Sequence, residues 1–277
     1  VPHNGNIPFT ISRGSYTGVP YNGTNGIQIT NINDNYNLIG NPYPSAIDAE
    51  EFLAANTYHA TTNPTGVIYG NVKLWTHGYQ PAAIVNPFYG SFAYNYNAND
   101  YVTLNYLGAS DPIGASNIIK SGQAFLVQMI DGTAGSGTIN FSNGMRLDAS
   151  NNPYNNSGFF RNANSSSEKH RIWLDLIDAN NIASGTLVGY ATDATYGFDT
   201  FFDAQAAVPG FMKIYSLIGN DVYDIQGRSL PFDQNDQVPL GATFVQAGNY
   251  TIALNTIDGI FLDSTQNIFL EDKLTNN

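Results

Sequence analysis

The residues best suited to chemistry in this chain are three aspartates, Asp193, Asp199 and Asp203, which flank a glycine-containing stretch. Clustered carboxylates are hard oxygen ligands of the kind that Ca²⁺ prefers, and backbone carbonyls can complete its shell. The spacing is not that of an EF-hand loop. The alternative is that these side chains close Asx turns or cap a short helical turn. A second, looser set of aspartates is considered for the same role: Asp221, Asp224, Asp233 and Asp236.

Aromatic residues gather in a second candidate region, between positions 75 and 101. In a strand over residues 88–96, four aromatic side chains share one face. At roughly 150–250 Å² each and about 25 cal/mol per Å², they represent roughly 15–25 kcal/mol if fully buried, more than the net stability of a typical domain. We therefore predict that most of this face is core. The side chains left as a possible saccharide platform are Trp75, Tyr79, Tyr94 and Tyr96.

Residues that could support catalysis are few and scattered. The histidines, at positions 3, 59, 77 and 170, show no metal-ligand spacing, and the sequence has no H-E-x-x-H, C-x-x-C or G-x-S-x-G motif. Two of the four glutamates, Glu50 and Glu51, are adjacent in an expected helix and point about 100° apart. A glycosidase needs two opposed carboxylates instead. We therefore expect that the protein is not an enzyme.

The composition indicates strands and excludes several kinds of partner. Of 277 residues, 42% are hydrophobic and only 12% charged, with 35 Asn against five Lys and four Glu. Many Tyr, Thr, Asn and Gly residues favour strands joined by tight turns. A net charge of −12 disfavours nucleic acid and anionic membranes as partners. The sequence contains no run of 18 apolar residues, so no membrane span is predicted. It also contains no cysteine, so the fold must be stabilised by packing and not by disulfides.

Alternation and turn signals predict two antiparallel units of the β-sandwich or jelly-roll kind. The first unit covers residues 1–147, an Asn/Ser-rich linker covers 148–167, and a second β-sandwich covers 168–277. Predicted strands of the first unit are 7–12, 26–30, 36–39, 66–69, 73–77, 88–96, 101–106, 123–129 and 137–141. Those of the second are 170–177, 186–190, 213–217, 222–225, 242–245, 250–254 and 267–271. Gly219-Asn220, Gln226-Gly227 and Ala247-Gly248 are predicted to separate strands.

One short helix, near residues 46–56, is predicted to interrupt the first unit. It follows Gly40-Asn41-Pro42-Tyr43-Pro44-Ser45, in which two prolines end the preceding strand because they lack an N–H and fix φ. Ser45 with Asp48 three residues later is a capping-box pattern. Ala46, Ala49, Phe52 and Leu53 then share one helical face.

Short sequence words in both units resemble the β-sandwich region that precedes the C-terminal sorting domain (type C-like) of Bacteroidota type IX secretion cargo. In the first unit these words are Gly40-Asn41-Pro42-Tyr43-Pro44-Ser45, Gly122-Gln123-Ala124-Phe125-Leu126-Val127 and Met145-Arg146. In the second they are His170-Arg171-Ile172-Trp173-Leu174, Leu187-Val188-Gly189-Tyr190, Ala194-Thr195-Tyr196-Gly197-Phe198-Asp199, Val238-Pro239-Leu240-Gly241 and Ile268-Phe269-Leu270-Glu271-Asp272-Lys273.

The resemblance implies a non-catalytic segment of a secreted cell-surface protein on the outer face of a Gram-negative cell. Such a segment would serve adhesion, display or spacing before a sorting signal. Its partners would be other regions of a longer polypeptide and the type IX secretion machinery. Because the family pattern continues beyond Asp272-Lys273, we expect the second sandwich to be truncated at its C-terminal end. The alternative function is a carbohydrate-binding module of a polysaccharide-degrading protein, with a polysaccharide or surface glycan as ligand.

Overall fold

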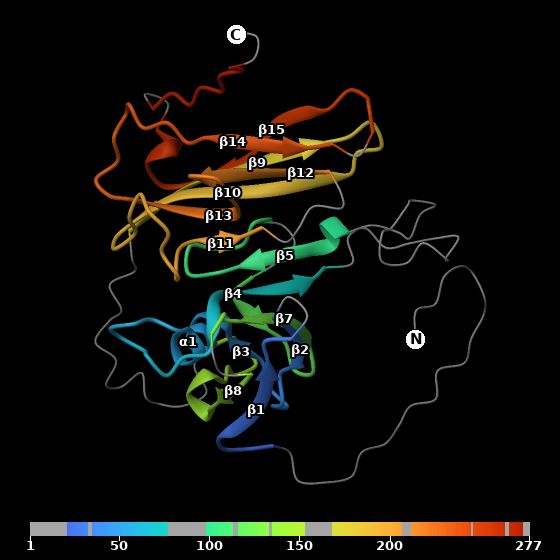
Figure 1. The fold of residues 1–277 in the computed structure, drawn as a ribbon, viewed down its shortest axis with the longest axis vertical. Helices are drawn as coiled ribbons and strands as arrows, with labels where there is room; N and C mark the ends of the chain where they lie inside the picture. Colours follow the sequence, from blue (N-terminus) through green and yellow to red (C-terminus); the bar gives the residue numbers. More distant parts are fainter. Residues whose placement is uncertain are drawn as a thin grey trace, which may run out of the picture.

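The computed structural model describes residues 21–32, 35–76, 98–112, 116–132, 135–152, 168–206, 212–244, 246–263 and 266–273. In these residues the chain is built from short strands and one α-helix of eight residues (Figure 1), which confirms the all-β prediction. None of the helices in this part of the chain has the length and apolar character that a membrane span requires. The strands predicted over 7–12 and 88–96 lie outside the described residues, as does most of the predicted linker.

The first unit contains two small sheets, one central sheet and the helix. In chain order its elements are β1 (Asn25–Thr30), β2 (Tyr36–Gly40), β3 (Ile47–Asp48), α1 (Ala49–Asn56), β4 (Ile68–Trp75), β5 (Tyr101–Leu104), β6 (Ile118–Ile119), β7 (Ala124–Met129) and β8 (Ser136–Phe141), with 3₁₀ turns at Ala98–Asp100 and Asn143–Met145. The central sheet has the order β2-β7-β4-β5, while β1 pairs with β8 and β3 with β6. All of these pairs are antiparallel.

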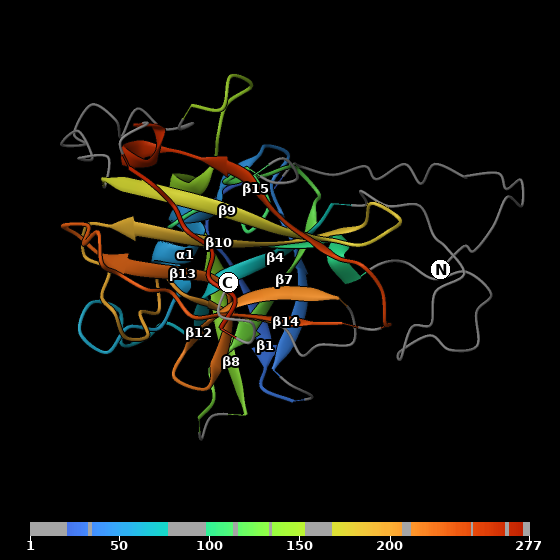
Figure 2. The ribbon, with the colours of Figure 1, turned by 90° about the horizontal axis from the view of Figure 1, so that it is seen from above.

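The second unit is one seven-stranded sheet. Its elements are β9 (Lys169–Ile177), β10 (Ala183–Ala191), β11 (Ala204–Gln205), β12 (Lys213–Ile218), β13 (Asp221–Ser229), β14 (Leu240–Thr243) and β15 (Thr251–Ile257), followed by a 3₁₀ turn at Gly259–Leu262. The order is β14-β12-β13-β10-β9-β15, with β11 also on β13. Of these pairs only β10 and β13 are parallel. Viewed from above, the sheet lies over the first unit (Figure 2).

Aromatic side chains fill the core of the first unit, where α1 packs against β7 and β8. Phe52 of the helix lies 5.2 Å from the ring of Phe125 and 5.1 Å from that of Phe141, and all three side chains are buried. Buried Asn56 ends the helix against strand β8, because its side-chain amide donates to the Asn140 carbonyl and accepts from the Asn140 N–H. The side chain thus satisfies a strand edge that would otherwise be buried without partners.

The first-unit words that carry the family resemblance meet in space. Asn41 is buried, and its side chain donates to the carbonyls of Ser45 (2.8 Å), Lys120 (3.1 Å) and Ile119 (3.3 Å) and accepts from the Tyr43 N–H (3.0 Å). The Asn41 N–H donates to the carbonyl of Gln123. These bonds tie the Asn-Pro-Tyr-Pro turn to the connection between β6 and β7.

Arg146, in the Met145-Arg146 word, contacts the Gly40-Asn41-Pro42-Tyr43-Pro44-Ser45 word. The Arg146 Nε donates to the Ser45 hydroxyl at 2.9 Å, and its guanidinium lies over the ring of Tyr43 at 5.3 Å. The buried Tyr43 hydroxyl donates to the Gly23 carbonyl at 2.6 Å. Residues about 100 positions apart therefore form one packed turn.

The helix begins later than its sequence predicts. Asp48, not Ser45, is the N-cap: its carboxylate accepts from the backbone N–H groups of Glu50 and Glu51, and α1 starts at Ala49. The capping-box prediction is wrong because the Ser45 hydroxyl is already committed to Arg146, and β3 occupies the residues just before the helix. A carboxylate is also the better cap, since it complements the helix dipole.

Two glycines that were expected near strand ends lie inside strands. The predicted strands 66–69 and 73–77 form the single strand β4, which passes through Gly70, and Gln226-Gly227 lies within β13 instead of separating two strands. A Cβ at Gly70 would stand 1.9 Å from the Thr200 carbonyl oxygen, and one at Gly227 would stand 2.5 Å from Cβ of Phe202. Both glycines therefore permit close approach of the 198–202 loop.

The predicted strand 267–271 is not formed, and apolar side chains there are exposed. Phe269 has 86% of its side-chain surface exposed, and Ile268 and Leu270 are also exposed. The neighbouring strand β15 pairs only with β9 among the described strands, and it carries exposed Ile252 and Leu254. The second unit thus has an open edge and a partly open apolar face.

Replacing Asn41 with alanine should destabilise the first unit by about 2–4 kcal/mol. The substitution leaves several backbone groups without partners at a buried position. Chemical denaturation at neutral pH measures the change. Asn235→Ala, at an exposed turn, is the matched control and should stay within about 0.5 kcal/mol of the parent chain. Equal stability of the two variants would contradict the role given to the Asn41 side chain.

Candidate binding cleft

The two units meet over a buried junction that the loop after β5 helps to build. Leu107 is fully buried and packs with Trp173 and Leu187 of the second unit. The Trp173 Nε1–H donates to the Ala109 carbonyl (2.8 Å), and Arg171 Nη1 donates to the Leu107 carbonyl (2.9 Å). The two units on either side of the predicted boundary after residue 147 therefore share a hydrophobic core, because a loop of the first unit packs into the core of the second.

A carboxylate at the centre of the junction is held by lysines of both units. Asp224 in β13 is buried; its Oδ1 lies 2.6 Å from Nζ of Lys213 and its Oδ2 lies 3.3 Å from Nζ of Lys73 in β4. The Thr103 hydroxyl donates to the same Oδ2 (2.9 Å) and accepts from Lys73 Nζ (2.9 Å). Because Lys73 and Thr103 are paired across β4 and β5, the first unit presents a cation and a hydroxyl side by side.

The charge state of Asp224 follows from these partners. Burial alone raises its pKa, but the charges of Lys213 and Lys73, with hydrogen bonds from Lys213 and Thr103, outweigh burial and hold the pKa of Asp224 below its usual range. The carboxylate is therefore ionised at neutral pH. Removing one partner of such a buried pair leaves an uncompensated charge, which is more costly than the pair is favourable.

The loop between β10 and β11 reaches from the second unit to the first. Phe201 stacks on His59 with ring centres 5.7 Å apart, and it meets Tyr106 edge-on at 5.0 Å. The Tyr106 N–H donates to the Phe201 carbonyl at 3.2 Å. There is no room for a side chain at position 70, beneath Thr200, and Gly70 therefore lets the loop lie directly on β4.

The predicted aspartate cluster shapes this loop. The Asp203 carboxylate is buried and accepts from the N–H groups of Asp199 (2.5 Å) and Gly227 (2.8 Å), and the Asp199 carboxylate accepts from the Thr195 N–H (2.5 Å). The N–H of Asp203 donates in turn to the Asp199 carbonyl (2.8 Å). Asp193 stands apart at the start of the loop, with φ of +71°, and its side chain is exposed.

These contacts match the turn-closing alternative, and calcium binding stays a prediction. Within the described ranges no group of three or more His, Cys, Asp or Glu side chains is arranged to hold a metal ion. Burial raises the pKa of Asp203 to about 7, against the lowering effect of the two backbone N–H groups. The looser set does not converge either: Asp224 lies in the junction, while Asp236 pairs with Arg228.

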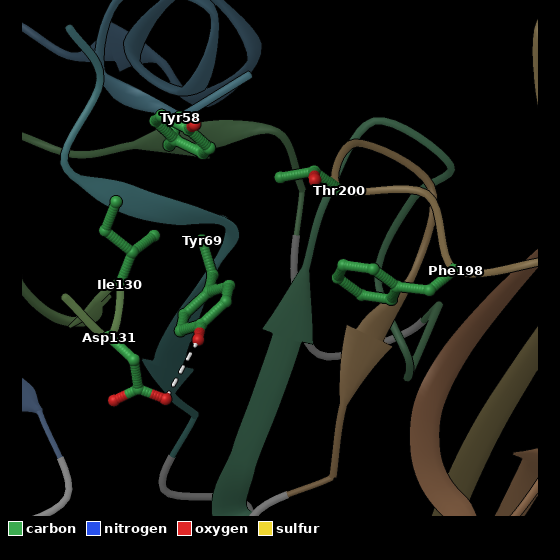
Figure 3. A pocket seen from close by; sticks show the side chains of 6 residues that line it. All are labelled: Tyr58, Tyr69, Ile130, Asp131, Phe198 and Thr200. Carbon is green, nitrogen blue, oxygen red and sulfur yellow. Dashed lines mark hydrogen bonds between the residues drawn. The ribbon is translucent and has the colours of Figure 1, made fainter. Parts of the chain in front are cut away.

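A cleft of about 420 Å³ opens beside this loop. One wall carries Tyr69 from β4 and Ile130 and Asp131 from the end of β7, and Tyr58 comes from the segment after α1 (Figure 3). The 198–202 loop of the second unit supplies the opposite wall, Phe198 and Thr200. The Tyr69 hydroxyl donates to Asp131 Oδ2 at 3.4 Å, and Asn35 Nδ2 donates to Asp131 Oδ1 at 2.6 Å.

Beside the cleft, the side chains pack closely and leave no room for a water molecule. This packed region contains Tyr69 and Phe198, and its other residues are polar: Asn71, Gln128, Asp203 and Gln205. Phe198 and Tyr58 are exposed, with 46% and 37% of the residue surface open to solvent. Aromatic walls with a few fixed polar groups are typical of small-molecule sites.

The predicted aromatic platform is not the residue set that lines this cleft. Trp75 ends β4 and is half-buried, with its ring 4.7 Å from that of Tyr101; Tyr79, Tyr94 and Tyr96 lie outside the described residues. Sequence reasoning missed Tyr58, Tyr69 and Phe198 because they come from distant segments. The one available signal was Phe198 itself, which lies inside the aspartate loop.

Comparison with protein families decides where the chain is classified. A family model described as a domain of unknown function (DUF8693) matches residues 1–277, the whole chain. The chain belongs to the DUF8693 family. Comparison with curated proteins gave no match, and neither did comparison with solved structures. The DUF8693 match covers both units, as does the type IX resemblance, which stays a prediction.

Asp224→Asn should destabilise the protein by about 3–5 kcal/mol at pH 7, because it leaves Lys73 buried without its counter-charge. Asp221→Asn, an exposed position in the same strand, is the matched control and should have little effect. The folded-state pKa of Asp224 lies below the unfolded value of about 3.9, so this stabilisation is present above pH 4 and is lost as pH falls.

Urea denaturation at pH 7 and at pH 3 measures both effects, and the difference between the parent chain and Asp224→Asn should shrink in acid. A Lys73→Met, Asp224→Asn double variant should show a loss smaller than the sum of the single losses, since the two side chains interact directly. Additive losses would contradict the assigned pairing.

Calcium at Asp193, Asp199 and Asp203 is tested by thermal melting in millimolar Ca²⁺ and in EDTA. A bound ion at a hundredfold excess over its Kd should stabilise the fold by about 2.7 kcal/mol, and Asp199→Ala should abolish the difference. The effect should grow as pH rises through about 7, where Asp203 loses its proton. Identical melting temperatures in the two buffers would leave these residues as turn formers.

Proposed function

We propose that the chain is a non-catalytic segment of a secreted cell-surface protein, exported by a type IX system and serving display, adhesion or spacing on the outer face of a Gram-negative cell. The observation that carries this proposal is the junction, where Asp224 is buried between lysines of both units. A spacer must hold the regions on either side of it in a fixed relation. Two units joined by buried polar contacts meet that requirement better than two units on a linker.

Three of the sequence words behind the type IX resemblance support the proposal because their residues make structural contacts. Asn41, Tyr43, Ser45 and Arg146 build one turn in the first unit. In the second unit, the word that contains Trp173 lies in β9 at the junction. These contacts are structural, and a set of recurring words with structural tasks suits a spacer or display segment.

The open face of the second unit supports contact with another region of a longer polypeptide. Ile252 and Leu254 are exposed on β15, opposite Leu176 and Leu174 of β9. An apolar sheet face of this kind, beside an edge that has no partner among the described strands, favours docking of further chain. The other proposed partner is the export machinery itself.

The alternative, a carbohydrate-binding module, draws its support from the cleft and not from the predicted platform. Exposed Phe198 and Tyr58 with Asp131 between the units form a ligand-sized hollow. The two proposals are compatible, because an adhesin can both space and bind.

Surface labelling tests the export proposal in a bacterium that carries the gene. An antibody raised against the purified chain should label intact wild-type cells, and external protease should remove the signal. In a strain without a functional type IX system, the protein should be retained inside the cell envelope and be protected from the protease. Unchanged surface labelling in that strain would contradict the export route, and a cytoplasmic signal in wild-type cells would contradict secretion.

A further inference from the structure

We propose that the cleft between the two units binds a neutral saccharide, through contact with Tyr58, Tyr69 and Phe198 and hydrogen bonds to Asp131 and Thr200. This inference rests on the proposed function in one respect only, because a protein on the cell surface encounters glycans. The argument for the ligand class comes from the lining residues.

The residues that line the cleft offer both apolar faces and hydrogen-bonding groups, which a sugar ring requires. Phe198, Tyr58 and Tyr69 provide apolar faces, and Ile130 adds a further apolar wall. The hydroxyls of the tyrosines and Thr200 both donate and accept, and the Asp131 carboxylate accepts. A ligand with apolar ring faces and hydroxyls that also donate and accept can use all of these groups at once.

Charge disfavours an anionic ligand. None of the residues that line the cleft is Lys or Arg, and the chain carries a net charge of −12, so an anionic ligand would be repelled. A cationic ligand would be attracted by Asp131 and by the aromatic faces, so it is the competing class that the titration below separates from a neutral saccharide. The Asp131 carboxylate also already accepts from Asn35 and Tyr69.

Contacts behind both walls hold the residues that line the cleft. Phe201 anchors the 198–202 loop between His59 and Tyr106, and Asp199 and Asp203 close it with backbone hydrogen bonds. On the other wall, Asn35 holds Asp131 through a side-chain hydrogen bond of 2.6 Å. A site with little motion to lose on binding keeps more of its contact energy as affinity.

The size of the cleft limits the ligand. A volume of about 420 Å³ lies at the low end of the range for small-molecule sites. The open mouth and the exposed Phe198 suit the terminal rings of a glycan chain, whose remainder extends into solvent. We therefore assign the site to a chain end or a short oligosaccharide.

The test is isothermal titration of the purified full chain with neutral oligosaccharides of glucose, galactose, mannose and N-acetylglucosamine. Matched arms contain an oligosaccharide of glucuronic acid and choline chloride. At least one neutral saccharide should bind, with stoichiometry near one, and the anionic and cationic probes should not. Absence of binding by every neutral saccharide at millimolar concentration would overturn the proposal, and so would preferential binding of choline or of the anionic sugar.

Variants locate the binding. Phe198→Ala should weaken binding by at least about tenfold, because it removes an exposed aromatic face that the bound ligand would cover. Phe244→Ala removes an equally exposed phenylalanine from the second unit, away from the cleft, and should leave affinity unchanged. Equal effects of the two variants would overturn the assignment of the site.

Asp131→Asn gives a second readout that keeps the shape of the wall. It replaces one of the two acceptor oxygens by an NH2 donor and removes the charge, so it should weaken binding several-fold while the melting temperature changes little at this exposed position. Unchanged affinity in Asp131→Asn would contradict the hydrogen-bonding role. These measurements use purified protein, so their failure would leave the surface-labelling result standing, and failure of surface labelling would leave the binding result standing.

Discussion

Ionisation of Asp224 inside the junction is the constraint on which the rest of the structure depends. A charged carboxylate in a buried site is tolerated only where cations and donors replace the water that it has lost. Lys213 comes from the same sheet, but Lys73 and Thr103 come from the first unit. The second unit therefore needs the first to complete the coordination of its own buried charge. Sliding one unit over the other would separate these partners, so the pair sets position as well as proximity.

The same placement creates the cleft. Lys73 holds β4 at the junction, and Tyr69 of the same strand forms part of one wall of the cleft. Gly70 lets the 198–202 loop rest on the strand to form the other wall. The loop reaches that position because the carboxylates of Asp199 and Asp203 accept hydrogen bonds from backbone N–H groups. The carboxylates of Asp199 and Asp203 thus shape the loop that presents Phe198 to the cleft, and their calcium binding stays a prediction.

Local patterns in the sequence were sufficient to predict most of the described strands but not the residues that line the cleft. Alternation in β9 is read correctly, but it does not reveal that the face with Arg171 and Trp173 meets the first unit. Gly70 and Gly227 resemble breaks because the close approach that requires them comes from a loop more than 20 residues away. The parallel pairing of β10 with β13 is likewise invisible to periodicity.

The cleft itself could not be predicted from spacing, because Phe198 of the second unit comes to lie opposite Tyr58 and Tyr69 of the first only where the two units meet. That dependence has a thermodynamic consequence. A ligand that contacts both walls binds the docked arrangement and not the separated one, so it stabilises docking by RT ln(1 + [L]/Kd). A ligand in the cleft and the buried ion pair of Asp224 and Lys73 therefore favour the same docked arrangement.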